Sequence, residues 1–326
     1  MRTLSARSDS FPLVAPFRIS RGVKTAADVV TVEIAADGHV GRGEGVPYPR
    51  YGETIESALA AIETVRAALE AGAGRTEISA LMPPSAARNA VDCALWDLEA
   101  RLAGTSVTAL LGRPPIAPTP TALTISLDTP EAMGAAALKL AGVPLIKIKV
   151  DRSDPAAQIK AVRAAAPKPR LIVDPNESWT IAEVRELQSL LVDLRVDLLE
   201  QPLPAAEDAA LEGFRSAVPI AADESAHVAA DLDALMQKYQ VVNIKLDKTG
   251  GLTAALELAD AATAKGMGLM TGCMVCSSLA IAPALIVAAN AAFADLDGPV
   301  WLANDRPGGV RCTDGILSPP SLWGSA

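Results

Sequence analysis

The stretch LIVDPNESWTIAEVRELQSLLVDLRVDLLE, residues 171–200, contains the unit that decides the fold. A short apolar run ends at Asp174, a stretch with helical spacing follows near 181–192, and a second apolar run ends at Glu200. One strand followed by one helix, repeated, is typical of a parallel β/α fold. The acidic residue that ends each strand is the first candidate for chemistry.

The same unit extends in both directions along the chain. The runs LIKIKV, PIAAD and VVNIKL place Lys149, Asp223 and Lys245 at the matching position, and the five positions are separated by 25, 26, 23 and 22 residues. Strands are expected to end near Ile125, Val150, Asp174, Glu200, Asp223, Leu246, Thr271 and Leu296. Helices are expected near 130–141, 154–165, 181–192, 207–216, 230–238, 252–265 and 277–290. The sequence therefore predicts an α/β fold, a modified (β/α)7β TIM-type barrel.

The organisation of the chain changes near residues 115 and 298. Residues 1–45 include VVTVEIAADGHVGRGEG, which alternates and turns like an antiparallel sheet, and 54–72 and 85–103 have helical spacing. The segment RPPIAPTPT is a linker, because prolines disfavour a continued helix. We expect an α+β capping domain over 1–115, the barrel with the active site over 116–298, and a segment over 299–326 that returns to the capping domain.

Composition favours a cytoplasmic enzyme. The net charge is −9 without a basic cluster interleaved with aromatics, which argues against nucleic acid as a partner. No apolar run of membrane-spanning length and no secretory signal is present, so neither a membrane partner nor export is expected. The four cysteines are expected to be reduced, and the pair Cys273 and Cys276 lacks the second pair of a zinc site. The oligomeric state stays open, a homo-oligomer included.

The predicted barrel gathers the five strand-end residues at one mouth, since carboxyl ends of barrel strands converge there. Three carboxylates, Asp174, Glu200 and Asp223, favour a hard divalent cation with oxygen ligands, above all Mg²⁺. The two histidines, His39 and His227, are expected on the surface rather than at the metal.

The two lysines suggest the reaction. Lys149 and Lys245 come from the second and sixth strands, so they would face each other across the mouth. A lysine serves as a base when neighbouring positive charge lowers its pKa, and Lys147, on the same strand face as Lys149, could do so together with the metal. Such an array can remove and return a proton beside a carboxylate, through an enediolate that the metal stabilises. The expected chemistry is racemisation or epimerisation.

These residues carry a resemblance that covers essentially the whole chain. The stretches KIKV, VDPNESW, LEQPLP, ADES and NIKLDKTGGLT resemble the muconate-lactonising subgroup of the enolase superfamily. That superfamily pairs a lysine or histidine base with magnesium. The resemblance implies catalytic Lys149 and Lys245 and metal ligands Asp174, Glu200 and Asp223. One departure is Pro175 in VDPNESW, where small residues are common; it leaves Asp174 in place.

The stretch ADLDGPVWL at 294–302 is similar to the dipeptide epimerases of that subgroup. The resemblance implies that Asp295 and Asp297 hold the free ammonium group of a dipeptide, and two carboxylates on one strand face can receive it. The implied substrate is L-Ala-D/L-Glu, and the implied context is recycling of cell-wall peptide.

Substrate selection is expected to involve the cap. The segments FRISRGVKT (17–25) and PYPRYGET (47–54) resemble the two loops that cover the site in the family, and we name them the first and second cap loops. A cation in the first loop, Arg21 or Lys24, would pair with the side-chain carboxylate of the substrate, and Arg50 is a third candidate. In GCMVCSS, Cys276 and Ser277 are candidates for substrate contact, with a packing role as the alternative.

Two other functions keep the same core. An N-acylamino acid racemase or a cycloisomerase would need Lys149, Lys245 and the acids, but no ammonium clamp. A non-catalytic binding barrel would bind metal or ligand without exchanging a substrate proton with solvent. The glycine-rich GRGEG lacks the GxGxxG context of a dinucleotide site.

Overall fold

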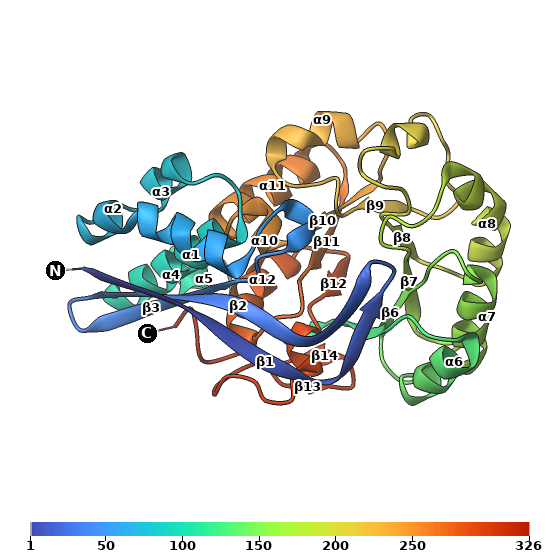
Figure 1. The fold of residues 1–326 in the computed structure, drawn as a ribbon, viewed down its shortest axis with the longest axis horizontal. Helices are drawn as coiled ribbons and strands as arrows, with labels where there is room; N and C mark the ends of the chain where they lie inside the picture. Colours follow the sequence, from blue (N-terminus) through green and yellow to red (C-terminus); the bar gives the residue numbers. More distant parts are fainter. Residues whose placement is uncertain (1, 326) are drawn as a thin grey trace.

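The computed structural model describes residues 2–325 as a barrel with a separate sheet-and-helix cap (Figure 1). The cap begins with the antiparallel strands β1 (Thr3–Ile19), β2 (Gly22–Ala36) and β3 (His39–Gly45). After a 3-10 turn at Pro49–Tyr51 come α1 (Ile55–Thr64), α2 (Arg66–Glu70), α3 (Arg75–Leu81), α4 (Ala86–Leu102) and α5 (Val107–Leu110). The helices predicted over 54–72 and 85–103 are confirmed, with the first interrupted at Val65.

The glycines of GRGEG allow β3 to lie directly against α4. A Cβ at Gly41, Gly43 or Gly45 would stand 2.2, 2.0 or 2.0 Å from a carbonyl oxygen of that helix. These glycines alternate along the strand and therefore share one face. The small size of these three residues therefore lets the strand pack directly against the helix.

The barrel consists of eight parallel strands in sequential order, as predicted. The strands are β5 (Ala122–Ile125), β6 (Leu145–Lys149), β7 (Arg170–Asp174), β8 (Leu198–Glu200), β9 (Ile220–Ala222), β10 (Val241–Ile244), β11 (Gly268–Gly272) and β12 (Phe293–Asp295). Side chains join the first and last strands: Thr121 Oγ1 accepts from Leu296 N at 2.8 Å, and Asp297 Oδ2 accepts from Thr124 N at 2.7 Å.

Five of the seven predicted barrel helices are full helices. They are α6 (Pro130–Lys139), α7 (Pro155–Ala165), α8 (Ile181–Asp193), α11 (Leu252–Ala264) and α12 (Ser278–Ala288). The prediction of a helix over 207–216 was wrong, and the helical stretch predicted over 230–238 is shorter than expected. The first region has one 3-10 turn (Asp208–Leu211) that ends where Glu212 takes a ψ of 125°, and Gly213 follows with a φ of +70°. The second has a 3-10 turn (Ala229–Asp231) and the short α9 (Leu232–Leu235), and a further short helix, α10 (Leu246–Thr249), follows β10.

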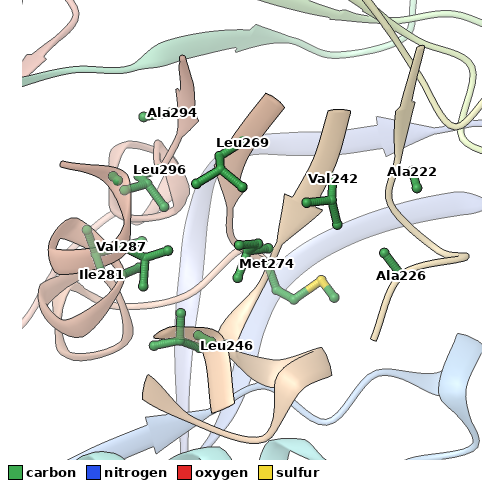
Figure 2. Close-up of a cluster of buried hydrophobic side chains, with 14 of the residues drawn as sticks. Ala222, Ala226, Val242, Leu246, Leu269, Met274, Ile281, Val287, Ala294 and Leu296 are labelled. Atoms are coloured by element: carbon green, nitrogen blue, oxygen red, sulfur yellow. The ribbon is translucent and has the colours of Figure 1, made fainter. Parts of the chain in front are cut away.

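Two apolar layers hold the barrel. Inside it, each strand contributes one buried side chain: Ala122, Leu145, Ile172, Leu198, Ala221, Val241, Met270 and Phe293. Outside it, Val242, Leu269 and Ile281 belong to the large cluster between strands and helices, part of which Figure 2 shows. This packing fixes the directions of the strands and hence the positions of the side chains at their ends.

The end of the chain touches both the linker and the cap. A small antiparallel sheet joins β4 (Thr119–Pro120) to β14 (Ile316–Leu317) and β13 (Cys312–Thr313), after a 3-10 turn at Gly298–Trp301. Beyond it, Trp323 Nε1 donates to the carbonyl of Cys93 in α4 at 3.0 Å. Within residues 2–325, every helix is too short or too polar to cross a membrane.

Candidate active site

Three of the five strand-end residues, Lys149, Asp223 and Lys245, line one cavity of about 440 Å³ between barrel and cap. The other two, Asp174 and Glu200, contact Lys147, which also lines it. Lys149 ends β6, Asp174 ends β7, Glu200 ends β8, and Asp223 and Lys245 directly follow β9 and β10. All five are buried, although their side chains are ionisable. The cavity walls include Lys147, Lys149, Asp223, Lys245, Asp295 and Asp297. The structure thus brings both predicted catalytic lysines to the same cavity.

Each lysine is paired with a carboxylate. Lys149 Nζ donates to Asp174 Oδ2 at 2.5 Å, and Lys245 Nζ donates to Asp223 Oδ2 at 2.7 Å. Burial by itself would lower the pKa of Lys245. The attraction of neighbouring carboxylates, of which Asp223 has the largest effect, is stronger and raises this pKa well above its usual value. A buried ammonium with such a partner is held in its protonated form.

Lys147 lies among three carboxylates. Its Nζ is 2.7 Å from Glu200 Oε2, 2.8 Å from Asp295 Oδ2 and 3.0 Å from Asp174 Oδ2. These carboxylates outweigh the effect of burial and raise the pKa of Lys147 well above its ordinary range. Lys147 and Lys149 share Asp174 Oδ2, so two ammonium groups converge on one oxygen atom.

Two residues that sequence reasoning missed complete this arrangement. Lys248 Nζ donates to Asp223 Oδ1 at 2.7 Å, and Asn243 Nδ2 donates to Glu200 Oε1 at 2.9 Å. The sequence offered a way to find both residues. Asn243 precedes Lys245 by two residues, just as Lys147 precedes Lys149, and residues two apart on a strand point to the same face. Lys248 lies one helical turn after Lys245, in α10.

The acids suit a hard divalent cation in their chemistry. Asp174, Glu200 and Asp223 offer oxygen ligands of the kind that Mg²⁺ prefers. Burial, followed by the neighbouring Asp174, raises the pKa of Glu200 to about 8. As the side chains stand, no three acidic groups within residues 2–325 already surround a point suited to an ion. The ammonium of Lys147 lies between Asp174 and Glu200 instead.

The two aspartates of ADLDG point into the cavity from the last strand. Asp297 uses Oδ2 to accept from Thr124 N and, at 3.3 Å, from Trp301 Nε1. Asp295 uses Oδ2 for Lys147, while its buried Oδ1 has no hydrogen-bond partner. Burial and the adjacent Asp295 raise the pKa of Asp297 to about 6. Asp295 Oδ1 therefore remains free to accept a hydrogen bond, while Asp295 Oδ2 is already bound to Lys147.

The cap loops supply the opposite wall of the cavity. Arg21, Lys24 and Arg50 all line it, but their contacts differ. Arg21 donates from Nη2 to Glu224 Oε1 at 2.6 Å, and Arg50 forms two 2.7 Å hydrogen bonds with Glu177. Lys24 Nζ lies 4.7 Å from the centre of the Tyr48 ring.

Ser277 and Cys276 lie behind the cavity wall. The loop presents Cys273, Met274 and Val275 to the cavity, and Cys276 and Ser277 are buried. Ser277 N donates to Glu44 Oε1 at 2.8 Å, and Arg306 Nε donates to Ser277 Oγ at 2.8 Å. Neither Cys276 nor Ser277 is among the residues that line the cavity. His39 is exposed, and His227 is half-buried with its ring against Tyr51.

Family models match both parts of the chain. Residues 1–112 match the mandelate racemase/muconate lactonizing enzyme N-terminal domain, and residues 131–325 match the enolase C-terminal domain-like family. L-Ala-D/L-Glu epimerase of Escherichia coli K12 is 48% identical over 97% of this chain and 99% of its own length. N-acetyl-D-glutamate racemase of a Pseudoalteromonas species is 44% identical over 91% of this chain and 96% of its own.

Solved structures give the same fold. An enolase family member from Agrobacterium tumefaciens with homology to dipeptide epimerases, determined with sodium and L-Ala-L-Glu, has a TM-score of 0.97 and 47% identity over 99% of this chain and 100% of its own. A dipeptide epimerase from Enterococcus faecalis V583, complexed with Mg and L-Leu-L-Tyr, has a TM-score of 0.91 and 29% identity over 99% of this chain and 98% of its own.

Proposed function

Since the chain belongs to the enolase superfamily, with the domain pair of mandelate racemase and muconate lactonizing enzyme, we propose that it is a magnesium-dependent dipeptide epimerase. It inverts the α-carbon of the C-terminal residue of L-Ala-D/L-Glu or a related dipeptide. One observation carries this proposal: Lys149 and Lys245 line the same cavity as Asp295 and Asp297. Two bases and an ammonium site are thereby present together.

The lysines exchange the α-proton. Lys149 comes from the second and Lys245 from the sixth of eight strands, so they approach a bound α-carbon from opposite sides. In either direction one lysine must be neutral to take the proton while the other is protonated to return it, and inversion follows. The ion pairs of Lys149 with Asp174 and Lys245 with Asp223 describe the protonated form of each.

Asp174, Glu200 and Asp223 are the proposed ligands of Mg²⁺. When bound, the cation supplies positive charge that stabilises the negative charge developing on the substrate carboxylate. Lys147 contributes charge to the same region, because it contacts two of these acids. Its proposed role is to lower the pKa of Lys149, with which it shares Asp174 Oδ2.

Asp295 and Asp297 are the proposed receptor for the dipeptide ammonium. The unpartnered Oδ1 of Asp295 is buried at the cavity, and the recorded hydrogen bonds of Asp297 use Oδ2. An ammonium bound here could donate to Asp295 Oδ1 and to Asp297. A substrate without this charge would leave Asp295 Oδ1 without a partner.

Lys24 is the proposed partner of the substrate side-chain carboxylate. Arg21 is already neutralised by Glu224 and Glu177, at 2.6 and 3.0 Å. Among the described residues, Lys24 has no carboxylate within ion-pair distance and still lines the cavity. Its contact with the Tyr48 ring leaves the ammonium free to donate hydrogen bonds to a carboxylate.

A cytoplasmic location and a role in recycling cell-wall peptide belong to the same proposal.

A second candidate is racemisation of an N-acylated amino acid, which the likeness to N-acetyl-D-glutamate racemase favours. The two substrates differ in one group: the dipeptide has a free ammonium, and the N-acylated amino acid does not. The deciding experiment is NMR of L-Ala-L-Glu and of N-acetyl-L-glutamate, each incubated with enzyme and Mg²⁺ in deuterated water. We expect deuterium at the glutamate α-carbon of the dipeptide as its epimer forms. Preferential exchange of the N-acetyl compound would favour the second candidate, and exchange of neither would exclude both.

A further inference from the structure

Glu177 gathers arginines from both cap loops. Its Oε2 accepts from Arg50 Nε at 2.7 Å and from Arg21 Nη1 at 3.0 Å, and its Oε1 accepts from Arg50 Nη2 at 2.7 Å and from Ala205 N at 2.8 Å. The carboxylate side chain is only 7% exposed, whereas those of Arg21 and Arg50 are 27% and 37% exposed. One carboxylate with a buried side chain therefore binds two arginines that come from different segments of the cap.

Glu177 lies in the turn that directly follows β7 and the proposed metal ligand Asp174. Glu177 follows Asp174 by three residues, and both Asn176 and Glu177 have positive φ angles, 46° and 66°. The first cap loop also contacts this turn, since Ser20 Oγ and Arg21 Nη1 donate to Asn176 O at 3.1 and 3.0 Å. Figure 1 shows the β1–β2 hairpin reaching from the cap to this side of the barrel.

We propose that Glu177 is a positioning residue that latches the first and second cap loops, through Arg21 and Arg50, onto the loop after β7 and so keeps the cavity covered. Charge-assisted hydrogen bonds to a partly buried carboxylate are strong enough to bias a loop between open and closed positions. Because one acid serves both arginines, the two loops close together. Arg21 binds Glu177 through Nη1 and binds Glu224 through its other terminal nitrogen, Nη2.

Limited trypsin digestion of the full chain, without substrate or Mg²⁺, tests the latch. Trypsin cuts after arginine and lysine, so cleavage after Arg21 and Lys24, identified by mass spectrometry, reports opening of the first loop. Glu177→Gln keeps the size of the side chain and every cleavage site. We expect it to accelerate this cleavage about tenfold, which corresponds to about 1.4 kcal/mol at 25 °C. Cleavage at the wild-type rate would overturn the proposal.

Two further variants separate the latch from general loosening. Glu99→Gln is the matched control, because Glu99 pairs with Arg75 within the cap and neither residue lines the cavity; it should digest like wild type. Arg50→Gln removes the second loop's contribution at a more exposed residue, so it remains informative if Glu177→Gln does not fold. It should accelerate cleavage after Arg21 and Lys24 if the loops close together. Unchanged cleavage would overturn the shared latch.

Kinetics give a second readout that depends on the proposed epimerase function. A weaker latch lowers the binding of substrate and transition state alike, so KM for L-Ala-L-Glu should rise several-fold in Glu177→Gln while kcat changes little. A fall in kcat with unchanged KM would assign Glu177 to the chemical step and overturn the latch. Digestion needs no turnover, so it tests the latch even if the proposed reaction is wrong.

Discussion

Lys147 and Asp295, from the second and eighth strands of the barrel, are joined by a 2.8 Å hydrogen bond across its interior. The same ammonium also contacts Asp174 and Glu200. One cation thereby offsets three carboxylates where the strands converge. Its removal is expected to affect both stability and catalysis.

Lys147→Met should destabilise the metal-free protein, because it leaves the buried carboxylates of Glu200 and Asp295 without a cation, whereas Asp174 keeps Lys149. Breaking a buried ion pair by removing one partner typically costs about 3–5 kcal/mol. Urea unfolding at pH 8 measures this change, with Lys139→Met on α6 as the control. A variant as stable as wild type would show that the acids do not depend on Lys147.

Single replacement of the catalytic lysines should separate the two halves of the reaction. Lys149→Ala and Lys245→Ala should each lose epimerisation by at least about a thousandfold, since one face of the α-carbon then lacks its acid or base. Each variant should still exchange the α-proton of one stereoisomer with deuterated water, and the two should differ in which isomer they exchange. Normal turnover in both variants would rule out the two-base assignment.

The free charge of Lys24 should determine preference for acidic dipeptides. Lys24→Met should raise KM for L-Ala-L-Glu about tenfold, equivalent to about 1.4 kcal/mol, and leave L-Ala-L-Met nearly unchanged. Steady-state kinetics with both dipeptides provide the comparison. If both KM values rise equally, Lys24 acts on the loop rather than on the substrate side chain.

Asp247 should make stability depend on pH. It is buried between cap and barrel, where it accepts from Val46 N and Asn89 Nδ2, and burial raises its pKa from 3.8 to about 7. Between these values the native protein keeps a proton that the unfolded chain releases, so stability falls as pH rises from about 4 to about 7.

Asp247→Asn should remove that dependence. Relative to wild type, its free energy of unfolding should increase by about 1.4 kcal/mol for each pH unit across this window. Urea unfolding at pH 5, 6, 7 and 8 measures the difference. Parallel pH profiles for the two proteins would mean that Asp247 is not protonated in the native state.

The strand-end pattern allowed the barrel and the candidate residues to be predicted. Strand ends near Asp174, Glu200 and Asp223 follow from local alternation and spacing, and the structure has strands that end there or one residue earlier. The helix expected over 207–216 was wrong, and the helical stretch expected over 230–238 spans only 229–235, because apolar spacing does not reveal where the backbone leaves helical geometry.

By itself the sequence determined which chemical groups reach the barrel mouth, because alternation and the β/α repeat are local properties of the chain. Tertiary structure decided which groups pair there. It turned Ser277 to Glu44, engaged Arg21 with Glu177 and Glu224, and joined Lys147 to Asp295. Hydrogen bonds and ion pairs depend on separations of a few ångströms, and packing between segments far apart in sequence sets those separations.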